Sequence, residues 1–457
     1  LGERGSHFIM GRSYYVDDGV EKYFSKLIQQ QKAYVTGLLI GQYSSQRDYA
    51  VLAAQTPQKE DQSEETKSGF SKLEGIDDEW VSMHASQLGR MLPGGLMVLG
   101  VFLMTSPDLS KDAQNVLRKL VFTVEKSSMK NRLWNFDDDD VSERVTLHIC
   151  SATKKITCRT YDINDPKSTP KPADWKYQSS GLSWLTIDCS VRVDVTIPLT
   201  SSSLTYQERQ KSIRLGLVKW AKEIEDSLVL FNGQVKDKSA DLFEEQKKSS
   251  RSSSHYSPQI ITANVLTAAP LIDSTRSTAL VQPCKSSLTI QGVVKCCGYI
   301  HSNRPKVKDA LQAVKRDILN TIQARCEMLF EDMMLNGPSK GTENEVCPLP
   351  QRVFVPIKGS SLKLCDYLFG DETSSDLQSH FLEIMDQEVE QNELEFPEKK
   401  CSCTQPEERE SEPVSYNLES KPVDQANSSS KFLLNKGLLI STVVASIAVI
   451  ISFYYII

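Results

Sequence analysis

The sequence predicts an α/β unit over residues 10–165, a mixed α+β unit over residues 181–386 and a single transmembrane helix at the C-terminus. Three observations predict this organisation. Helix and strand patterns alternate through the first stretch, which is typical of an α/β unit. In the second stretch, strand patterns are grouped around three helix patterns. Residues 437–457 are largely apolar and contain no Asp, Glu, Lys or Arg.

The first unit opens with a helix and two strands. Residues 18–21 (DGVE) have the form of a capping box, and apolar residues follow them at helical spacing. Residues 33–40 and 49–56 are apolar stretches of strand length. Residues 58–75 are polar and charged, so we expect them to form a loop.

The most apolar strand pattern comes next. Residues 80–91 repeat apolar side chains at helical spacing, and residues 96–104 (LMVLGVFLM) form a continuous apolar run. Such a run is typical of a central strand that is covered on both faces. A third amphipathic helix is predicted over residues 109–124, and a hairpin over residues 144–161 completes the unit.

A linker and the second unit follow. Residues 165–180 are rich in Pro, Lys and Ser, which is typical of a linker. The sequence KKSSRSSSHYSP within residues 237–258 predicts a disordered insert. The longest helix pattern runs from Pro305 to about Asn336. The other expected elements are strands over 187–197, 259–266, 279–283 and 288–300, a helix over 213–228, a hairpin over 353–367 and a helix over 377–385.

The charge distribution separates a neutral body from an acidic tether. The chain has a formal net charge of −6, but residues 386–430 alone contain twelve acids and four bases. The rest is close to neutral, which excludes nucleic-acid binding by counterion release. Residues 387–436 lack apolar periodicity and are predicted to be a flexible tether. The eleven cysteines are irregularly spaced, which favours a reducing compartment over a disulfide framework.

The C-terminal segment GLLISTVVASIAVIISFYYII is predicted to be a transmembrane tail anchor. As a helix it would extend about 30 Å, which matches the hydrocarbon core of a bilayer. No secretory signal follows Met10, and residues 1–9 are interpreted as an upstream or non-native segment. We therefore expect the N-terminal units to face the cytosol. The anchor residues include Gly437, Leu438, Ile440, Val444, Ile450, Tyr454, Tyr455 and Ile457.

A search for catalytic signatures is negative. The sequence contains no GxxxxGK[ST] loop, no GxGxxG after a strand, no GxSxG elbow and no HExxH helix. His148 and Cys150 alternate on a predicted strand and so share a face, but their closeness alone is weak evidence for a thiolate nucleophile. We therefore expect no catalytic, cofactor-binding or metal-binding residues, and no cofactor.

One stretch resembles a known metal site. Residues 100–107 (GVFLMTSP), followed by Asp112, resemble the motif of the MPN-fold (JAMM) deubiquitinating metalloproteases. That family holds zinc with a His-x-His pair and an Asp. Leu103 and Thr105 stand at the histidine positions here, and neither residue supplies an imidazole nitrogen. The resemblance implies a catalytically dead MPN-like domain that binds or scaffolds without cutting.

Seven stretches together resemble a second family. They are MGRSYYV, VTGLLIGQYSSQRDY, RMLPGGLMVLGVF, RLWNF, SERVTLHICSATKKITCRTYDINDPKS, ADWKYQSS and RPKVKDALQAVKRDILN. Over residues 10 to about 385 the chain is similar to the odorant response abnormal protein 4 family. The resemblance implies a protein of the endoplasmic-reticulum membrane that helps multipass receptors, notably odorant receptors, to leave the reticulum. It also implies a link to a cysteine protease that removes a ubiquitin-fold modifier.

The predicted function is therefore that of a non-enzymatic, membrane-anchored adaptor for receptor trafficking. An anchor confines the cytosolic units to one membrane and so raises the local concentration of what they bind. The expected partners are multipass receptors, the modifier protease and the lipid bilayer. Two alternatives remain: a JAMM-like metalloprotease acting on ubiquitin-like conjugates, which lacks its His-x-His pair, and a membrane-fusion protein, which would need long heptads before the anchor.

Overall fold

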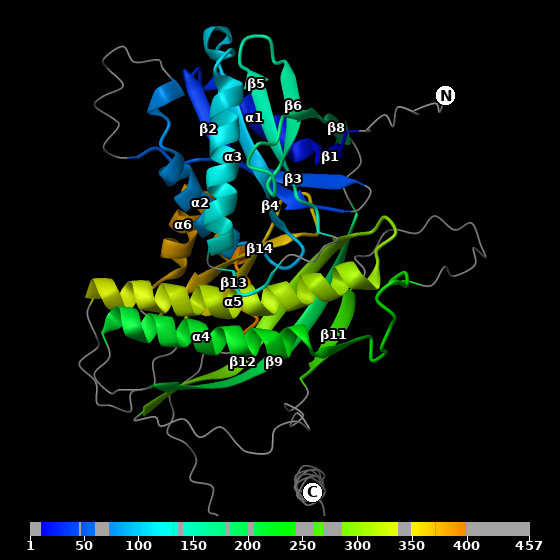
Figure 1. Cartoon of the computed structure of the whole chain (residues 1–457), viewed down its shortest axis with the longest axis vertical. Helices are drawn as coiled ribbons and strands as arrows, with labels where there is room; N and C mark the ends of the chain where they lie inside the picture. Colours follow the sequence, from blue (N-terminus) through cyan, green and yellow to red (C-terminus); the bar gives the residue numbers. More distant parts are fainter. Residues whose placement is uncertain are drawn as a thin grey trace, which may run out of the picture. The chain divides into compact units, whose positions relative to one another are not determined.

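The computed structural model describes residues 11–398 except for 45–46, 60–72, 131, 136–139, 179–182, 200–204, 244–259, 268–285, 337–348 and 371. The described residues all belong to one compact unit. Within it lie an eight-stranded sheet, a four-stranded sheet and a two-stranded hairpin (Figure 1).

The eight-stranded sheet nearly closes on itself. Its strand order is β7-β6-β5-β4-β2-β3-β1-β8, and residues 171–178 connect the two edges by pairing first with β6 and then with β1. Between these pairings, Ala173 N donates to Cys158 O at 3.1 Å and Asp174 N donates to Arg12 O at 2.9 Å. The strands are β1 (Ser13–Asp17), β2 (Tyr34–Gln42), β3 (Asp48–Gln55), β4 (Met97–Thr105), β5 (Glu143–Cys150), β6 (Ile156–Asp162), β7 (Lys171–Pro172) and β8 (Asp174–Gln178).

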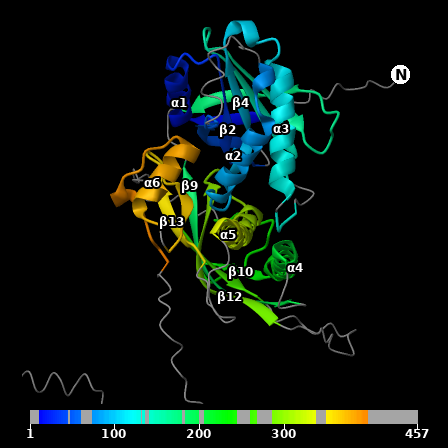
Figure 2. The ribbon, with the colours of Figure 1, turned by 90° about the vertical axis from the view of Figure 1, so that its left-hand side faces the viewer.

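Helices cover both faces of this sheet (Figure 2). Helix α1 (Asp18–Gln29) packs on one face, against Phe102 of the central strand β4. Helices α2 (Asp78–Arg90) and α3 (Ala113–Lys130) pack on the other face, against Val101 and Leu103. The prediction that residues 96–104 form a central strand covered on both faces is therefore confirmed. Short 3-10 turns at Leu73–Gly75 and Pro107–Leu109 precede α2 and α3.

The second sheet has the order β10-β11-β9-β12. Its strands are β9 (Trp184–Leu199), β10 (Leu228–Phe231), β11 (Ile260–Leu266) and β12 (Ser286–His301). β9 and β12 are antiparallel along their whole length. Helices α4 (Tyr206–Glu225) and α5 (Val307–Asn336) lie side by side over one face, as Figure 1 shows. Their buried apolar residues include Trp220 of α4 and Ile318 of α5.

The C-terminal elements fold back onto the first sheet's helices. They are β13 (Gln351–Pro356), β14 (Lys363–Leu368), α6 (Ser374–Met385) and a 3-10 turn at Gln391–Glu393. Cys365 N donates to Met91 O at 2.9 Å, and His84 Nε2 donates to Ile384 O at 2.8 Å. The core beneath α2 and α3 therefore contains Phe381 and other residues from the C-terminal segment.

This architecture corrects the predicted fold class. The prediction of an α/β plus α+β protein with a catalytically dead MPN-like domain and a C-terminal single transmembrane helix is wrong. The described residues form one mixed α/β unit, in which one core draws side chains from both predicted parts. No helix in the described part of the chain is long and apolar enough to cross a membrane. The predicted anchor, residues 437–457, lies outside the described residues.

Two local predictions also differ from the structure. Residues 171–178, expected to belong to a linker, form β7 and β8 because their backbone groups pair with the two edges of the first sheet. Residues 387–398, expected to begin a flexible tether, pack against β13, where Phe354 and Glu395 exchange two backbone hydrogen bonds. Neither contact can be predicted from neighbouring residues, because the strands that these segments contact lie far away along the chain.

Candidate functional site

A cavity of about 920 Å³ lies beside helix α5. On one side it is bounded by the end of β2, by α2 and by the segment that follows α3. On the other side it is bounded by one face of α5 and by the turn 301–306 before that helix. Because its walls come from segments far apart in the sequence, the cavity is a product of the tertiary fold. We refer to it as the cleft.

The α5 face toward the cleft is polar over most of the helix. Its residues recur every three or four positions, which places them on one side of an α-helix. At 1.5 Å per residue, the stripe is about 27 Å long. Its members are Asp309, Gln312, Arg316, Asn320, Gln323 and Glu327.

A cluster of guanidinium groups surrounds Trp134 on the cleft wall. The Cζ atoms of Arg132 and Arg316 lie 4.7 and 4.2 Å from the indole ring. The indole Nε1 donates to Asn320 Oδ1 at 2.8 Å, and Arg316 pairs with Asp140 at 2.6 Å. Burial lowers the pKa of Arg132, while the carboxylate of Glu125 opposes this shift. The cluster therefore places two guanidinium groups on the wall, each beside a carboxylate, since Arg132 lies 3.5 Å from Glu125 and Arg316 pairs with Asp140.

The opposite end of the stripe is closed by ion pairs. Arg90, on α2, contacts Glu331 at 2.7 Å and Glu327 at 3.4 Å, and both glutamates belong to α5. Burial alone would lower the pKa of Arg90, but the hydrogen bond and the charge of Glu331 raise it. Arg90 therefore stays charged and joins α2 to α5 at this end.

Stacked rings form another part of the wall. The rings of Tyr49 and His301 lie 3.6 Å apart and are nearly parallel at 9°, and Trp184 meets both edge-on. Burial, aided by the nearby positive charge of Arg47, lowers the pKa of His301 to about 4. His301 is consequently neutral at physiological pH and acts as part of the aromatic packing.

The mouth of the cleft carries three exposed cations. Lys306 pairs with Asp241 at 2.7 Å. Within the described part of the chain, the side chains of Lys238 and Arg304 have no recorded ion pair or hydrogen bond. Arg304 has a φ of 51°, a left-handed conformation that is strained for a residue with a side chain.

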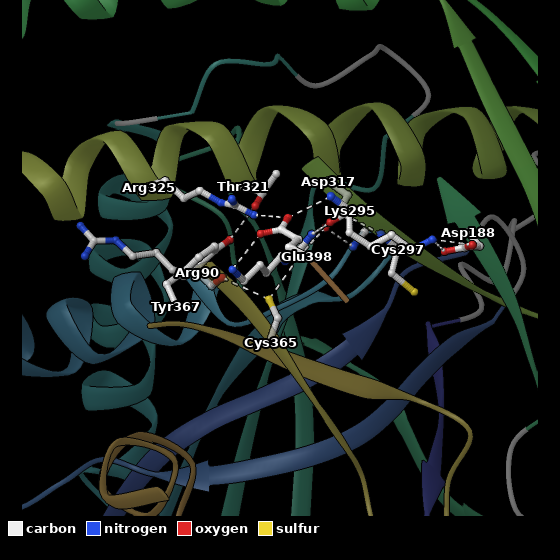
Figure 3. A network of polar contacts seen from close by, with 12 residues as sticks. Arg90, Asp188, Lys295, Cys297, Asp317, Thr321, Arg325, Cys365, Tyr367 and Glu398 are labelled. Atoms are coloured by element: carbon white, nitrogen blue, oxygen red, sulfur yellow. Dashed lines mark hydrogen bonds and ion pairs between the residues drawn. The ribbon is translucent and has the colours of Figure 1, made fainter. Parts of the chain in front are cut away.

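Behind the cleft, another face of α5 carries a buried ion pair. Asp317 is 0% exposed and accepts two hydrogen bonds from Arg352, each of 2.8 Å (Figure 3). The same carboxylate accepts the backbone N–H groups of Gly94 at 2.9 Å and Cys297 at 2.8 Å. Burial opposes a charge on Arg352, but Asp317 raises its pKa. We call this group of residues the joint.

Glu398 extends the joint at the far end of the described chain. Its carboxylate accepts hydrogen bonds from Arg325, from Lys295 N and from Arg352 N, at 2.7, 2.9 and 3.0 Å (Figure 3). The sulfur of Cys365 lies 3.2 Å from Arg352 Nη2. The joint therefore ties α5 to the loop before β4, to β12 and to the C-terminal hairpin.

The residues singled out by the metalloprotease resemblance do not line the cleft. Leu103 is buried against α2 and α3, Thr105 Oγ1 lies 2.9 Å from His148 Nε2, and Asp112 is exposed. No group of three metal-ligating side chains occurs among the residues that the structure describes. The pKa of Cys150 is lowered, chiefly because the Thr153 hydroxyl hydrogen-bonds to it.

Neither the cleft nor the joint is predicted by the sequence patterns. Asp317 and Arg352 interrupt apolar patterns, and both are buried in the structure. A charged residue within an apolar pattern is therefore the sequence feature that could indicate a buried ion pair. The polar stripe on α5 is the complement of its apolar face, and this pattern is typical of any solvated helix face. Chemically, the cleft offers charged, amide and hydroxyl groups for hydrogen bonding, so its arrangement suits binding.

Comparisons with known proteins agree with the family suggested by the motifs. The profile of the family described as "ODR4-like: Odorant response abnormal 4-like" matches residues 37–396. A Xenopus laevis protein named "Protein odr-4 homolog" is 85% identical over 98% of this chain and 100% of its own length, and a Homo sapiens protein of the same name is 49% identical over 98% and 99%. "Odorant response abnormal protein 4" of Caenorhabditis elegans is 24% identical over 76% of this chain and 71% of its own length.

A solved structure gives a distant match. The crystal structure of UfSP from C. elegans matches with a TM-score of 0.42 and 10% sequence identity, over 83% of this chain and 57% of that one. A likeness at this level carries no argument about function.

Proposed function

Because the chain belongs to the ODR4-like family, we propose that it is a non-enzymatic adaptor that helps multipass receptors, such as odorant receptors, to leave the endoplasmic reticulum. The observation that carries this proposal is the match of the family over residues 37–396. The C. elegans relative is named "Odorant response abnormal protein 4", and the vertebrate relatives are named as odr-4 homologues.

The proposal includes a place and a second partner. The protein acts at the cytosolic side of the reticulum membrane, where it recruits a cysteine protease specific for a ubiquitin-fold modifier. An adaptor of this kind brings receptor and protease together and so raises their effective concentration for one another.

The geometry of the molecule supports binding as its activity. The cleft is lined by amide, hydroxyl and charged groups, and its walls are fixed by ion pairs on α2 and α5. Several of its charged residues are engaged with each other or with aromatic rings, as Arg316 is with Asp140 and Trp134, while Lys238 and Arg304 are exposed. Such groups recognise polar partners by hydrogen bonding and charge.

Receptor delivery in cells that lack the protein tests the proposal. An epitope-tagged odorant receptor is expressed with the full chain or with an empty vector, and surface receptor is counted by antibody staining without permeabilisation. We expect the full chain to raise surface receptor several-fold and the receptor to be retained in the reticulum without it. Equal surface staining in both conditions contradicts the proposed trafficking role.

The recruitment step has its own test. The full chain is captured from gently solubilised membranes, and the modifier protease is detected by immunoblot. We expect the protease to co-purify and to leave the reticulum fraction when the adaptor is deleted. A protease that stays in the reticulum fraction after the deletion rules out recruitment.

A further inference from the structure

We propose that the cleft binds an extended acidic peptide segment of a partner protein, whose carboxylates pair with Lys238 and Arg304 at the mouth. The inference rests on the proposed function only for the biological role of that partner. The binding itself follows from the cleft and is tested without any receptor or protease.

The charges at the mouth indicate an acidic ligand. Most cations of the cleft have a carboxylate partner: Arg90 pairs with Glu331, and Arg316 pairs with Asp140. Lys238 and Arg304 are exposed, and no described carboxylate pairs with either. Two unpaired cations at the entrance of a cleft attract and orient an anionic partner.

The structure fastens together the two backbone segments that carry these cations. Leu242 N donates to Pro305 O at 2.8 Å, and Lys308 N donates to Lys238 O at 3.0 Å. These bonds fasten the loop that carries Lys238 to the turn that carries Arg304. Lys306 and Asp241 add an ion pair of 2.7 Å between the same two segments. Because the two loops are braced against each other, a ligand needs to order the side chains of Lys238 and Arg304 but not their backbone.

The backbone at Arg304 points to the same conclusion. Its φ of 51° is unfavourable for an L-residue, and the position before Pro305 is restricted further. Such strain persists only where the surrounding structure holds it. Here the strain places a long, exposed cationic side chain at the cleft mouth, where Gly would have satisfied the backbone at lower cost.

The size and lining of the cleft specify an extended peptide. A cavity of about 920 Å³ is large for a single small anion. The polar stripe on α5 is about 27 Å long, which matches roughly eight residues of extended chain. The lining includes the amides of Gln312 and Asn320 and the hydroxyls of Ser127 and Ser128, which can hydrogen-bond to a peptide backbone, beside apolar side chains such as Met97.

Fluorescence anisotropy with the purified full chain tests the proposal. The probe is a fluorescein-labelled octaglutamate peptide, and a labelled Gly-Ser peptide of the same length is the neutral comparison. We expect octaglutamate to bind, the neutral peptide to bind at least about tenfold more weakly, and added salt to weaken the octaglutamate complex. The double variant Lys238→Glu/Arg304→Glu is expected to lose at least about tenfold in affinity.

A matched control separates the site from overall charge. Lys211→Glu/Lys219→Glu makes the same change in net charge at two exposed positions of α4 that do not line the cleft. We expect this control to keep its affinity within about twofold. Thermal unfolding of both variants verifies that they are folded. Equal losses in both double variants, or equal binding of the neutral peptide, overturn the proposal.

The same variants separate this inference from the proposed function. If Lys238→Glu/Arg304→Glu loses octaglutamate binding and receptor delivery together, both stand. If it loses octaglutamate binding while receptor delivery is unchanged, the cleft still binds acidic peptides but serves no step of trafficking. If the wild-type chain fails to bind octaglutamate, the peptide site is rejected whatever the delivery assay shows.

Discussion

Helix α5 carries charged residues on two faces, and the surroundings of the two faces differ. At the joint, Asp317 is fully buried, and its carboxylate is satisfied by Arg352 and by two backbone N–H groups. At the cleft, Arg316 and its neighbours border an open space, and at the mouth Arg304 is exposed without a described carboxylate partner. The same residue types therefore hold the fold together on one face and remain accessible on the other.

The difference shows that burial determines whether a charged residue mainly stabilises the fold or is available to bind a ligand. Burying an ion pair costs desolvation energy, which the attraction between the two charges offsets. When one partner is removed, the other charge stays buried without this attraction, and the fold is strongly destabilised. An exposed cation near a cleft is well hydrated, so its removal affects stability little and affects a ligand much more. The two faces of α5 can accordingly be distinguished by experiments that measure stability and binding separately.

The largest effect is expected at the joint. Asp317→Asn leaves the guanidinium of Arg352 buried without a countercharge, so the free energy of unfolding should fall by about 3–5 kcal/mol. Urea denaturation measures this loss. Lys119→Ala, which breaks an exposed ion pair with Asp78, is the control and should cost less than about 1 kcal/mol. A loss at Asp317 no larger than the control would show that the joint does not hold the fold together.

A double variant sharpens this test. Asp317→Leu/Arg352→Met removes both charges, which often restores stability in other buried pairs. Here the recovery should be partial, because the N–H of Cys297 loses its bond to Asp317 and the N–H of Gly94 keeps only its bond to Cys297 O, at 2.9 Å. Full recovery would mean that these two hydrogen bonds contribute nothing measurable.

The next largest effect is expected at the turn that borders both regions. Gly94 bonds to the joint, and Gly95 lines the cleft with a φ of 84°. A Cβ at Gly95 would lie 2.0 Å from the carbonyl oxygen of Tyr299, so Gly95→Ala should lower the free energy of unfolding by about 2–4 kcal/mol. Gly233→Ala is matched, because Gly233 has a φ of 77° and no atom within 4 Å of its Cβ position. It should cost only about 1 kcal/mol, and equal costs at the two glycines would rule out the close contact.

The aromatic wall of the cleft should be sensitive to acid. The pKa of His301 is about 4, below the ordinary value of 6.5. The unfolded chain therefore binds a proton at this histidine at a higher pH than the folded chain does. The contribution of neutral His301 to the free energy of unfolding is fully present above pH 6.5. It is lost as pH falls towards 4, by at most about 3 kcal/mol. Urea denaturation across this range measures the slope. His301→Phe keeps a ring against Tyr49 and cannot titrate, so its curve should be flatter than that of the wild type.

A second histidine, His380, provides a control because its pKa is shifted in the opposite direction. His380 Nδ1 donates a hydrogen bond of 2.7 Å to the carboxylate of Asp366, and this bond raises the pKa of the histidine. Its contribution is present below the unfolded pKa and is lost as pH rises through the raised folded value. His380→Gln should therefore lower the free energy of unfolding at acid pH. It should leave unchanged the rise of the free energy of unfolding with pH that His301 produces. An identical response of the two variants would contradict these assignments.

The smallest effect on stability is expected at the cleft mouth. Arg304→Gly relieves a left-handed conformation that costs about 1–2 kcal/mol in an L-residue, while the extra freedom of glycine in the unfolded chain takes back about 0.5–1 kcal/mol. The net change should be a gain of at most about 1 kcal/mol. Octaglutamate affinity should fall in the same variant. A clear loss of stability would place Arg304 among the structural residues, with those of the joint.

The sequence predicted most elements because their signals are local. The helical repeat over residues 305–336, the central strand over 96–104 and the hairpin over 353–367 are all present, with bounds that differ by a few residues. The family was also readable from motifs, and the profile over residues 37–396 confirms it. The fold class was wrong because it divided the described chain into units that share one core.

The sequence by itself therefore determined the family and the periodicity of helices and strands, because these depend on neighbouring residues. The tertiary structure alone decided which charges are buried and which line a cleft. Asp317 and Arg316 are adjacent on α5, yet one meets Arg352 and the other meets Asp140 and Trp134. Helical geometry points neighbouring side chains in different directions, and only the packing of distant segments determines what each of them meets.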